Sequence, residues 1–387
     1  MRVCLLAISI IADDARIRRH GDALAAAGYD VTAVGLGGGR GTLPVWPIIA
    51  MGPGGSGLLY YAQRMASLAA ARMVPALAEF AYWHSGANAE LYKAGLRTQA
   101  DIWVANDWLA LPAAVRLARE KGGIVVYDSH EYAVEEGIDR LSWRLLFPTY
   151  IRALEQRHIG QTAAVMTVAD GIADLIQADY RLAARPQVVR NIVPFIETAF
   201  RPTGERIEVL YHGTIRDDRG LCALVKSVRH WAPQFHLLIR GFGEQTVVDG
   251  LRSSAAATAP DRIRFEPAVK PDRVVQAANR SDIGIHPIPP TSRQTRFCLP
   301  NKFFEYVMAG LALCLSDAEE MGRLLRAHDL GASIAGLSPE AIAAAVNGFT
   351  RDRIDGCKRR SLETARTLCW EQESRKLVAL FDSLKGV

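Results

Sequence analysis

The chain has 387 residues, of which 49% are hydrophobic and 22% charged, a composition typical of a globular protein with a sizeable core. This length exceeds that of one ordinary domain, so two domains of similar size are expected. The formal net charge of +5 is too small to indicate a nucleic-acid-binding protein, although it suits an anionic substrate or an anionic membrane surface.

The cysteines and the apolar stretches indicate a cytoplasmic protein. Six cysteines lie far apart and form no CxxC pair that would suggest a zinc or redox site, and most stand in apolar runs, which favours buried, reduced thiols. The N-terminal run Val3–Ile8 is short and precedes Asp13 and Asp14, so it is interpreted as a buried strand and not as a signal peptide. The longest apolar stretch, 65–83, is interrupted by two charged residues and a proline and is not expected to span a bilayer.

The first half of the chain alternates short apolar runs with longer amphipathic stretches, a pattern typical of β-α units on a parallel sheet. The runs predict strands over Val3–Ile8, Asp30–Val34, Ile102–Ala105, Ile124–Tyr127 and Ala164–Thr167. The stretches between them predict helices over Arg16–Ala27, Tyr60–Ala81, Leu111–Glu120 and Trp143–His158.

The pattern pauses near Pro194, and a second series of the same kind follows. It predicts strands over Glu208–Tyr211, His236–Arg240, Ile263–Phe265, Ile283–His286 and Leu311–Leu315, and a last helix over Glu371–Leu384. Two such series predict an α/β protein of two Rossmann-like lobes, residues 1–195 and 196–369. Ligands are expected at the carboxyl ends of the strands and in a central cleft between the lobes.

The segment after the strand Glu208–Tyr211 has features of a diphosphate-binding turn. Gly213 permits a close approach of the backbone, and Arg219 offers a planar fork of donors. The predicted helix over Leu221–Val228 would add the free N–H groups of its N-terminus, with Asp217 and Asp218 capping it. The alternative interpretation, an ordinary β-α turn with a solvated arginine, is favoured when this segment is considered alone.

A second group of polar residues lies in the segment Leu299–Gly310. Pro300 marks the start of a helix, and Lys302 and Glu305 fall on one face near its N-terminus. A cation at this place can meet a phosphate, and a carboxylate can accept hydrogen bonds from two ribose hydroxyls. The alternative is a glutamate that interacts with the helix dipole beside a neighbouring lysine.

A third group follows the predicted strand Ile124–Tyr127. Asp128, His130 and Glu131 stand at its carboxyl end, where open α/β sheets keep their reactive groups. A lone histidine is more often structural, and the flanking carboxylates leave a functional and a structural role equally open here.

These three groups, in this order, resemble the retaining GT-B glycosyltransferases of the glycosyltransferase 4 type, the "glycosyl transferases group 1" grouping. The resemblance covers nearly the whole chain. It comprises a first β-α unit over Asp13–Val31, a "YDSHE" segment over Val126–Glu131, a "YxG…RGL" donor loop over Tyr211–Leu221 and a "PxKxFEYxxAG" signature over Pro300–Gly310.

The resemblance implies a cytoplasmic bacterial hexosyl- or glycosyltransferase of the GT-B fold, in which a C-terminal helix over 370–387 returns to the first domain. Such an enzyme moves a sugar from a nucleotide diphosphate sugar, UDP-linked or GDP-linked, to an acceptor with retention of configuration. No metal and no cofactor are expected, because the nucleotide sugar is itself a substrate. The enzyme could also lie at the inner face of the membrane.

The resemblance also assigns roles to residues. Arg219 matches the basic residue on the pyrophosphate, Glu305 the glutamate on the ribose and His130 the histidine near the transferred sugar. The predicted catalytic residues are His130, Arg219 and Lys302. The predicted donor-binding residues are Gly213, Thr214, Arg216, Arg219, Gly241, Val269, Cys298, Leu299, Lys302 and Glu305. The predicted acceptor-side residues are Asp13, Arg16, Asp107 and Glu131.

Two positions depart from the family pattern. Thr214 stands where many members have an arginine, so Arg216 or Lys302 would supply the second positive charge. Phe297 stands where many members have a glutamate that contacts the sugar, so the backbone of Phe297–Pro300 would recognise the sugar, whose identity stays open. A coupling enzyme of the same fold, a non-catalytic sugar-nucleotide-binding partner and an epimerase are the alternatives.

The acceptor is not identified by the sequence. A sugar, a glycolipid or another small molecule would fit, and no nucleic acid is expected. The first lobe holds basic residues interleaved with apolar ones that suit a peripheral membrane contact. An ordinary solvated face is the favoured alternative. The residues considered for this membrane contact are Arg16, Arg18, Arg19, Arg64, Arg72, Trp143 and Arg144.

Overall fold

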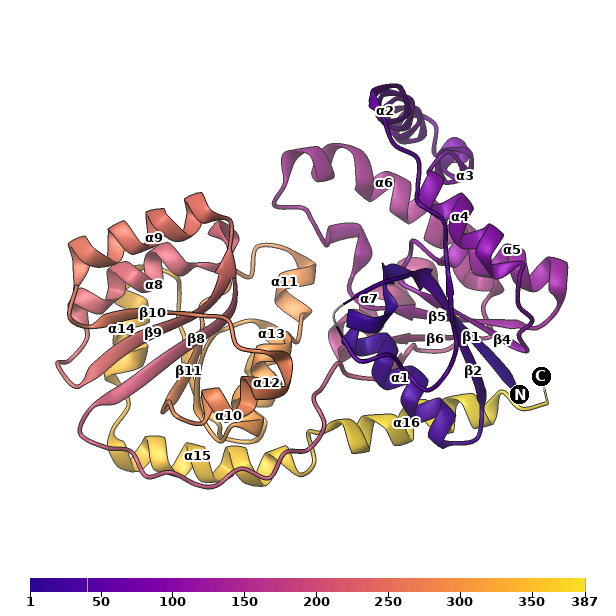
Figure 1. Cartoon of the computed structure of the whole chain (residues 1–387). Helices are drawn as coiled ribbons and strands as arrows, with labels where there is room; N and C mark the ends of the chain where they lie inside the picture. The colour runs from indigo at the N-terminus through magenta and orange to yellow at the C-terminus, as the bar shows by residue number, and fades with distance from the viewer. Residues whose placement is uncertain (40, 387) are drawn as a thin grey trace. The chain divides into compact units, whose positions relative to one another are not determined.

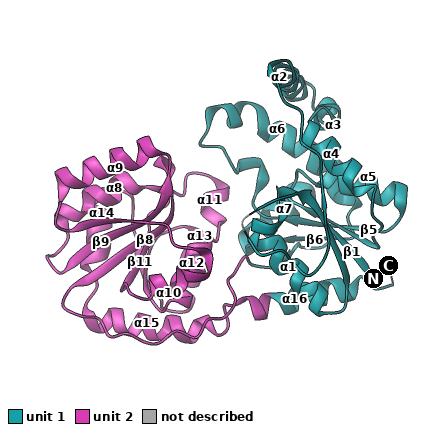
Figure 2. Ribbon diagram, in the orientation of Figure 1, with its two compact units in different colours: residues 1–190, 374–387 teal, residues 191–373 magenta. Residues whose placement is uncertain are grey.

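The protein folds into two compact units, which Figure 2 shows in different colours. The structure, a computed structural model, describes residues 1–39 and 41–386. Unit 1 comprises residues 1–190 and 374–387, and unit 2 comprises residues 191–373. Each unit contains one parallel sheet, which confirms the predicted α/β fold of two Rossmann-like lobes.

The sheet of unit 1 has seven parallel strands in the order β3-β2-β1-β4-β5-β6-β7. Their bounds are β1 Arg2–Ile10, β2 Asp30–Leu36, β3 Ile48–Ala50, β4 Ile102–Asn106, β5 Ile124–Ser129, β6 Ala164–Thr167 and β7 Gln187–Val188. The central strands are buried along most of their length, as expected for parallel strands with helices on both faces. The strand order reverses between β1 and β4, the place where such sheets bind ligands.

Seven helices surround this sheet in the described part of residues 1–190 (Figure 1). They are α1 Ala15–Ala26, α2 Leu58–Met73, α3 Ala78–Trp83, α4 Gly86–Gly95, α5 Leu111–Lys121, α6 Leu141–His158 and α7 Asp170–Tyr180. Asp14 caps α1 by accepting hydrogen bonds from the backbone N–H groups of Arg16 and Ile17. The single helix predicted over Tyr60–Ala81 is wrong, because Val74 is extended before Pro75 and a new helical turn begins there.

The sheet of unit 2 repeats the same topology, with six parallel strands in the order β10-β9-β8-β11-β12-β13. Their bounds are β8 Ile207–Ile215, β9 Phe235–Gly243, β10 Ile263–Pro267, β11 Ile283–His286, β12 Ala312–Ser316 and β13 Gly331–Ile334. The helices are α8 Leu221–Ser227, α9 Gln245–Thr258, α10 Val274–Ala278, α11 Arg293–Phe297, α12 Asn301–Met308, α13 Glu319–Ala327, α14 Pro339–Asn347 and α15 Arg351–Ala365. The strand order reverses between β8 and β11, so a ligand is expected at the carboxyl ends of these strands.

The chain passes from unit 1 to unit 2 between Arg190 and Asn191, five residues before the predicted boundary. The extended segment that follows is held by unit 2, because the Ile196 N–H contacts Met308 Sδ and Thr203 donates to Asp355. The chain returns to unit 1 within α16, which spans Trp370–Ser383. Val387, the last residue of the predicted closing helix, lies outside the described residues.

In the part of the chain that the structure describes, no helix combines the length and the apolar character needed to cross a bilayer.

Candidate functional site

The central strand of unit 2, β8, continues further than predicted and carries Gly213 inside the sheet. Residues 212–214 do not turn out of the strand, because they remain paired with β9 up to the pair Ile215–Gly243. Gly213 has φ +113°, a backbone conformation that residues other than glycine rarely adopt. It pairs with Gly241 of β9. The backbone at the carboxyl end of β8 is therefore open to close approach.

Helix α12 brings Lys302 and Glu305 to this backbone. Lys302 Nζ would lie 3.4 Å from a Cβ built on Gly213, and it stands 4.1 Å from the centre of the Tyr211 ring. Glu305 Oε2 lies 2.8 Å from His212 Nε2, without the alignment of a regular hydrogen bond. Two side chains one helical turn apart thus meet consecutive residues of β8, as their spacing predicts.

Positive charges crowd the end of β8. Burial and, after it, the Arg219 guanidinium lower the pKa of Lys302 to about 7, against the opposing effect of Glu305. Burial and the charges of Lys302 and Arg219 also hold the pKa of His286 well below its usual value, so this histidine is neutral. An anion bound here would relieve the repulsion between the two cations.

The loop after β8 differs from its prediction in one respect. Asp217 and Asp218 do not cap α8, because they form a short 3-10 turn with Arg219 and the residue before α8 is Gly220. Gly220 has φ +70°, and a Cβ at this position would lie 2.1 Å from the carbonyl oxygen of Pro287, which only glycine avoids. Asp218 instead accepts a hydrogen bond from Arg216 Nη2 at 2.9 Å and lies 3.7 Å from Arg219 Nε.

The other predicted donor-binding residues lie along the same edge of the sheet. Thr214 is exposed, and its carbonyl oxygen accepts a hydrogen bond from the Tyr211 hydroxyl. Val269 follows β10 and is exposed. Cys298 is partly exposed and its thiol donates to the Thr295 carbonyl oxygen, whereas Leu299 is buried. Only the backbone of Leu299 is therefore placed to contact a ligand.

Sequence reasoning missed three residues at the carboxyl ends of the strands. His286 ends β11, and among residues 1–39 and 41–386 neither of its ring nitrogens has a hydrogen-bond partner. Arg240 of β9 binds Glu266 Oε2 through two nitrogens, while its buried Nη1 has no partner in the described chain. Tyr306 accepts the His212 N–H and donates to the Ile285 carbonyl oxygen. The rule that ligands lie at strand ends could have selected His286 and Arg240.

We expect Gly213→Ala to destabilise unit 2 by about 1–2 kcal/mol, because alanine disfavours a positive φ, and to weaken nucleotide binding, because its methyl group would fill the space beside Lys302. Calorimetry with UDP and denaturant unfolding would measure the two effects. Gly204→Ala is the matched control, since a Cβ at Gly204 meets no atom within 4 Å. Equal nucleotide affinity in both variants would contradict the position given to Lys302.

A buried ion pair organises the carboxyl edge of the unit 1 sheet. Arg16 binds both oxygens of Asp128, at 2.9 and 2.6 Å, and donates a third hydrogen bond to the Val189 carbonyl oxygen. Arg16 is only 4% exposed, and its predicted acceptor-side role stays a prediction. Arg16 stands in the first turn of α1, directly after the capping residue Asp14.

His130 extends this network to the protein surface. Its Nε2 lies 3.2 Å from Asp128 Oδ2, and its side chain is partly exposed. Burial lowers the pKa of His130, but the Asp128 carboxylate outweighs burial and raises the pKa above its usual value. His20 lies 3.5 Å from the same oxygen, and burial together with Arg16 holds its pKa well below the usual range. Asp128 therefore lies beside one arginine and two histidines, and the pKa is raised in one histidine, His130, and lowered in the other, His20.

The remaining predicted acceptor-side residues follow neighbouring strands of unit 1. Asp107, directly after β4, has φ +69°, and strained residues of this kind concentrate at functional sites. Burial raises the pKa of its carboxyl group, and His130 opposes that effect. Asp13 accepts the Gly41 N–H, and Glu131 is exposed after β5. All three thus stand at the edge of the sheet where His130 lies.

No cluster of three metal-ligating side chains occurs among residues 1–39 and 41–386.

Comparison with known proteins decides between the functions that such a fold can carry. Residues 14–191 match the glycosyl transferase 4-like domain, and residues 206–352 match the glycosyl transferases group 1 domain. The chain is a glycosyltransferase of the GT-B type. Each match lies almost wholly within one unit, and together they include every predicted site residue except Asp13. No protein with a curated description matches this glycosyltransferase in sequence.

Solved structures similar to this glycosyltransferase share its fold over the whole chain. Sucrose-phosphate synthase from Thermosynechococcus elongatus is 16% identical, with a TM-score of 0.73 and coverage of 99% of each chain. An E. coli trehalose-6-phosphate structure bound with UDP-2-fluoro glucose is 12% identical, with a TM-score of 0.69 and coverage of 100% and 99%. Anabaena HepE in complex with UDP and glucose is 12% identical, with a TM-score of 0.67 and full coverage of both chains. At these identities the likeness establishes the fold.

Proposed function

We propose that this glycosyltransferase transfers a sugar from a UDP-sugar to an acceptor hydroxyl, with retention of configuration and without a metal ion. A GDP-sugar is the second candidate donor. The observation that carries the proposal is the meeting of Gly213, Arg219, Lys302 and Glu305 at the carboxyl end of β8. Two of the similar structures contain UDP or a UDP-sugar, which supports the choice of uridine.

In this proposal the diphosphate lies between Arg219 and Lys302, against the exposed backbone of Gly213. Lys302 suits this role because a nearby phosphate would restore the charge that burial and Arg219 weaken. Glu305 accepts hydrogen bonds from the ribose hydroxyls, and His212 Nε2 lies 2.8 Å from the same carboxylate. His286 and the Nη1 atom of Arg240 are buried polar groups near the same edge that a ligand could satisfy.

The reaction breaks the bond between the anomeric carbon and the β-phosphate oxygen, and the electron pair stays on the phosphate. The acceptor oxygen bonds to the anomeric carbon, and its proton passes to the leaving phosphate. Arg219 and Lys302 stabilise the charge that grows on the leaving phosphate, the function that a metal ion serves in other transferases. We place His130 beside the transferred sugar. Its raised pKa favours the charged imidazolium, which would donate a hydrogen bond to a sugar hydroxyl.

Turnover of a donor panel tests this function. UDP- and GDP-sugars would be incubated with acceptor extracts, with and without EDTA, and release of UDP or GDP would be measured. We expect acceptor-dependent release that survives EDTA. Nucleotide binding without turnover would identify a binding partner instead, and loss of activity in EDTA would refute the metal-free mechanism.

Replacing Glu305 with alanine is expected to weaken binding of the preferred nucleotide by about 1.5–3 kcal/mol, because a charge-assisted hydrogen bond to ribose is lost. Calorimetry with UDP and GDP measures this change. The control is Glu340→Ala, which removes a largely exposed carboxylate of α14 in the same unit. Unchanged affinity for both nucleotides in Glu305→Ala would show that the ribose lies elsewhere.

A further inference from the structure

Helix α2 of unit 1 presents an apolar face to solvent. Its buried residues are Ser67, Leu68 and Ala71, which lie on one side of the helix. At 3.6 residues per turn, the opposite side carries Leu58, Leu59, Ala62, Met65, Ala69 and Met73, and all six are exposed. Leu58 is 88% exposed and Leu59 72%. We call these six residues the α2 face.

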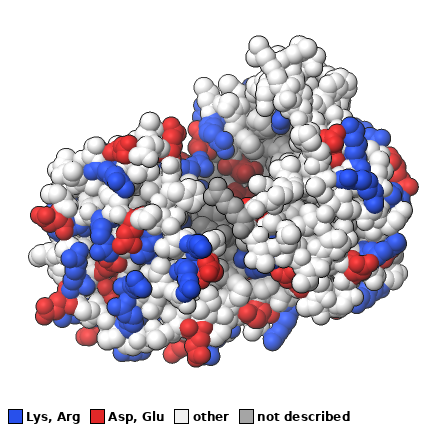
Figure 3. All heavy atoms as spheres, in the orientation of Figure 1, with Lys and Arg blue, Asp and Glu red and all other residues white. Residues whose placement is uncertain are grey.

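The apolar surface continues onto neighbouring helical segments. Phe80 of α3 is exposed, and so are Leu141 and Leu145 at the start of α6, the helix that packs against both α2 and α3. Arg72 joins α2 to α6 by donating to the Leu145 carbonyl oxygen. In Figure 3 the protruding end of unit 1 that carries α2 is almost entirely without charged side chains. A helix apolar on its exposed side normally has a partner that covers it.

The charged residues of α2 are both arginines, and the start of α6 is preceded by Asp139 and Arg140. Between Asp30 and Glu79 the sequence contains no aspartate or glutamate, and Glu79 already pairs with Arg157. Arg72 lies at the end of α2, and Arg140 and Arg144 lie exposed at the start of α6, whereas Arg64 is on the buried side of α2. This combination of apolar residues flanked by arginines suits a surface that is apolar in its interior and anionic at its boundary.

We propose that the α2 face docks on an anionic lipid bilayer, with its apolar residues in the interfacial layer and the arginines among the headgroups. The helix of 16 residues is about 24 Å long and can lie in the membrane plane. A second copy of this chain fits less well, because a two-fold contact would bring the exposed arginines of both copies together. This docking is independent of the proposed sugar transfer and of the donor site in unit 2.

Co-sedimentation with vesicles tests the docking. The full chain would be mixed with vesicles of equimolar phosphatidylcholine and phosphatidylglycerol, and with vesicles of phosphatidylcholine alone. We expect binding to the anionic vesicles that weakens with salt, and little binding to the neutral ones. The variant Leu58→Asp with Leu59→Asp should lower the partition coefficient by at least ~10-fold. Aspartates in the first helical turn favour the helix, so the fold should be preserved.

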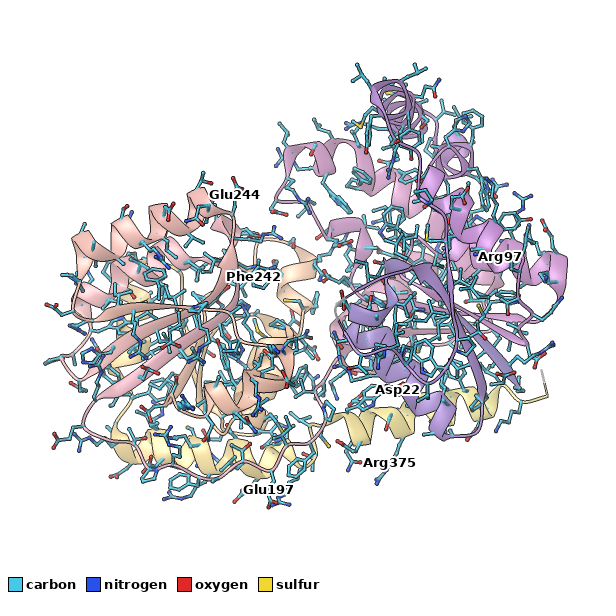
Figure 4. The ribbon with its side chains drawn as sticks, in the orientation of Figure 1. Asp22, Arg97, Glu197, Phe242, Glu244 and Arg375 are labelled. Carbon is cyan, nitrogen blue, oxygen red and sulfur yellow. The ribbon has the colours of Figure 1, made fainter. Side chains whose placement is uncertain are left out.

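Two further variants complete the experiment. Arg144→Glu should weaken binding to anionic vesicles, since it reverses one positive charge beside the face. Phe242→Asp is the matched control and should bind like the wild type, because Phe242 is 65% exposed but lies on β9 of unit 2 (Figure 4). Equal vesicle binding of the wild type and the Leu58/Leu59 variant would overturn the proposal. It would also be overturned by a dimer, seen in light scattering, that the Leu58/Leu59 variant abolishes.

Discussion

Arg219→Ala is expected to lower the turnover number by roughly 10²–10³-fold, the loss typical of removing one preorganised donor from a developing negative charge. Arg219 stands in the loop after β8, and its charge already acts on Lys302 and His286. Because the charge on the leaving diphosphate grows in the transition state, donor affinity should fall less than the rate does. Steady-state kinetics and calorimetry on the same variant measure the two quantities.

Arg219→Lys separates charge from geometry. Lysine keeps one positive charge but lacks the planar fork, so its rate should lie between those of the wild type and Arg219→Ala. The control is Arg229→Ala, an exposed arginine at the other end of α8 whose Nε donates to the Lys226 carbonyl oxygen. A rate of Arg219→Ala close to that of the Arg229 control would remove Arg219 from the mechanism.

The second large effect is on stability. Asp128→Ala is expected to destabilise unit 1 by about 3–5 kcal/mol, because the buried Arg16 guanidinium would keep its charge without a carboxylate partner. Denaturant unfolding measures the loss. Asp101→Ala provides the control, because it removes the partner of Arg2 from a pair whose side chains are 50% and 38% exposed. That substitution should cost no more than about 1 kcal/mol.

The same network predicts a pH dependence. The pKa of His130 is raised in the folded protein, so its pairing with Asp128 contributes stability that is fully present below the unfolded pKa of about 6.5. This contribution is lost as pH rises through the folded pKa. His20 stays neutral in this range, and Arg16 keeps its charge. His130→Gln should therefore flatten the stability curve above neutral pH, and an unchanged curve would refute the pairing.

Much of the fold can be predicted from the sequence because parallel strands buried on both faces are nearly continuous apolar runs. The runs Val3–Ile8 and Ile283–His286 correspond to β1 and β11 without ambiguity. The short edge strands β3 and β7 escaped prediction, since two or three residues carry no pattern. The end of β8 was also missed, because glycines favour turns in isolation and only pairing with β9 keeps residues 212–215 in the sheet.

The candidate site, too, could be predicted from the sequence only in part. Lys302 and Glu305 could be placed on one helix face from their spacing, a local property of the chain. Their contacts with Gly213 and His212 depend on residues some 90 positions away and on the packing of α12 against β8. His286 was overlooked although the predicted strand Ile283–His286 ends there, because only the structure shows that its ring is fully buried without a partner among the described residues.

Sequence by itself determined the two-lobed α/β architecture and the order of the motifs, because hydrophobic periodicity and short spacings are local. Only the tertiary structure showed that the charge of Arg16 is satisfied by Asp128, which lies 112 positions away in the sequence. It alone also decided that α2 is exposed. Leucine and methionine are equally suited to a core and to a lipid surface, so burial depends on what packs against the helix, which composition does not encode.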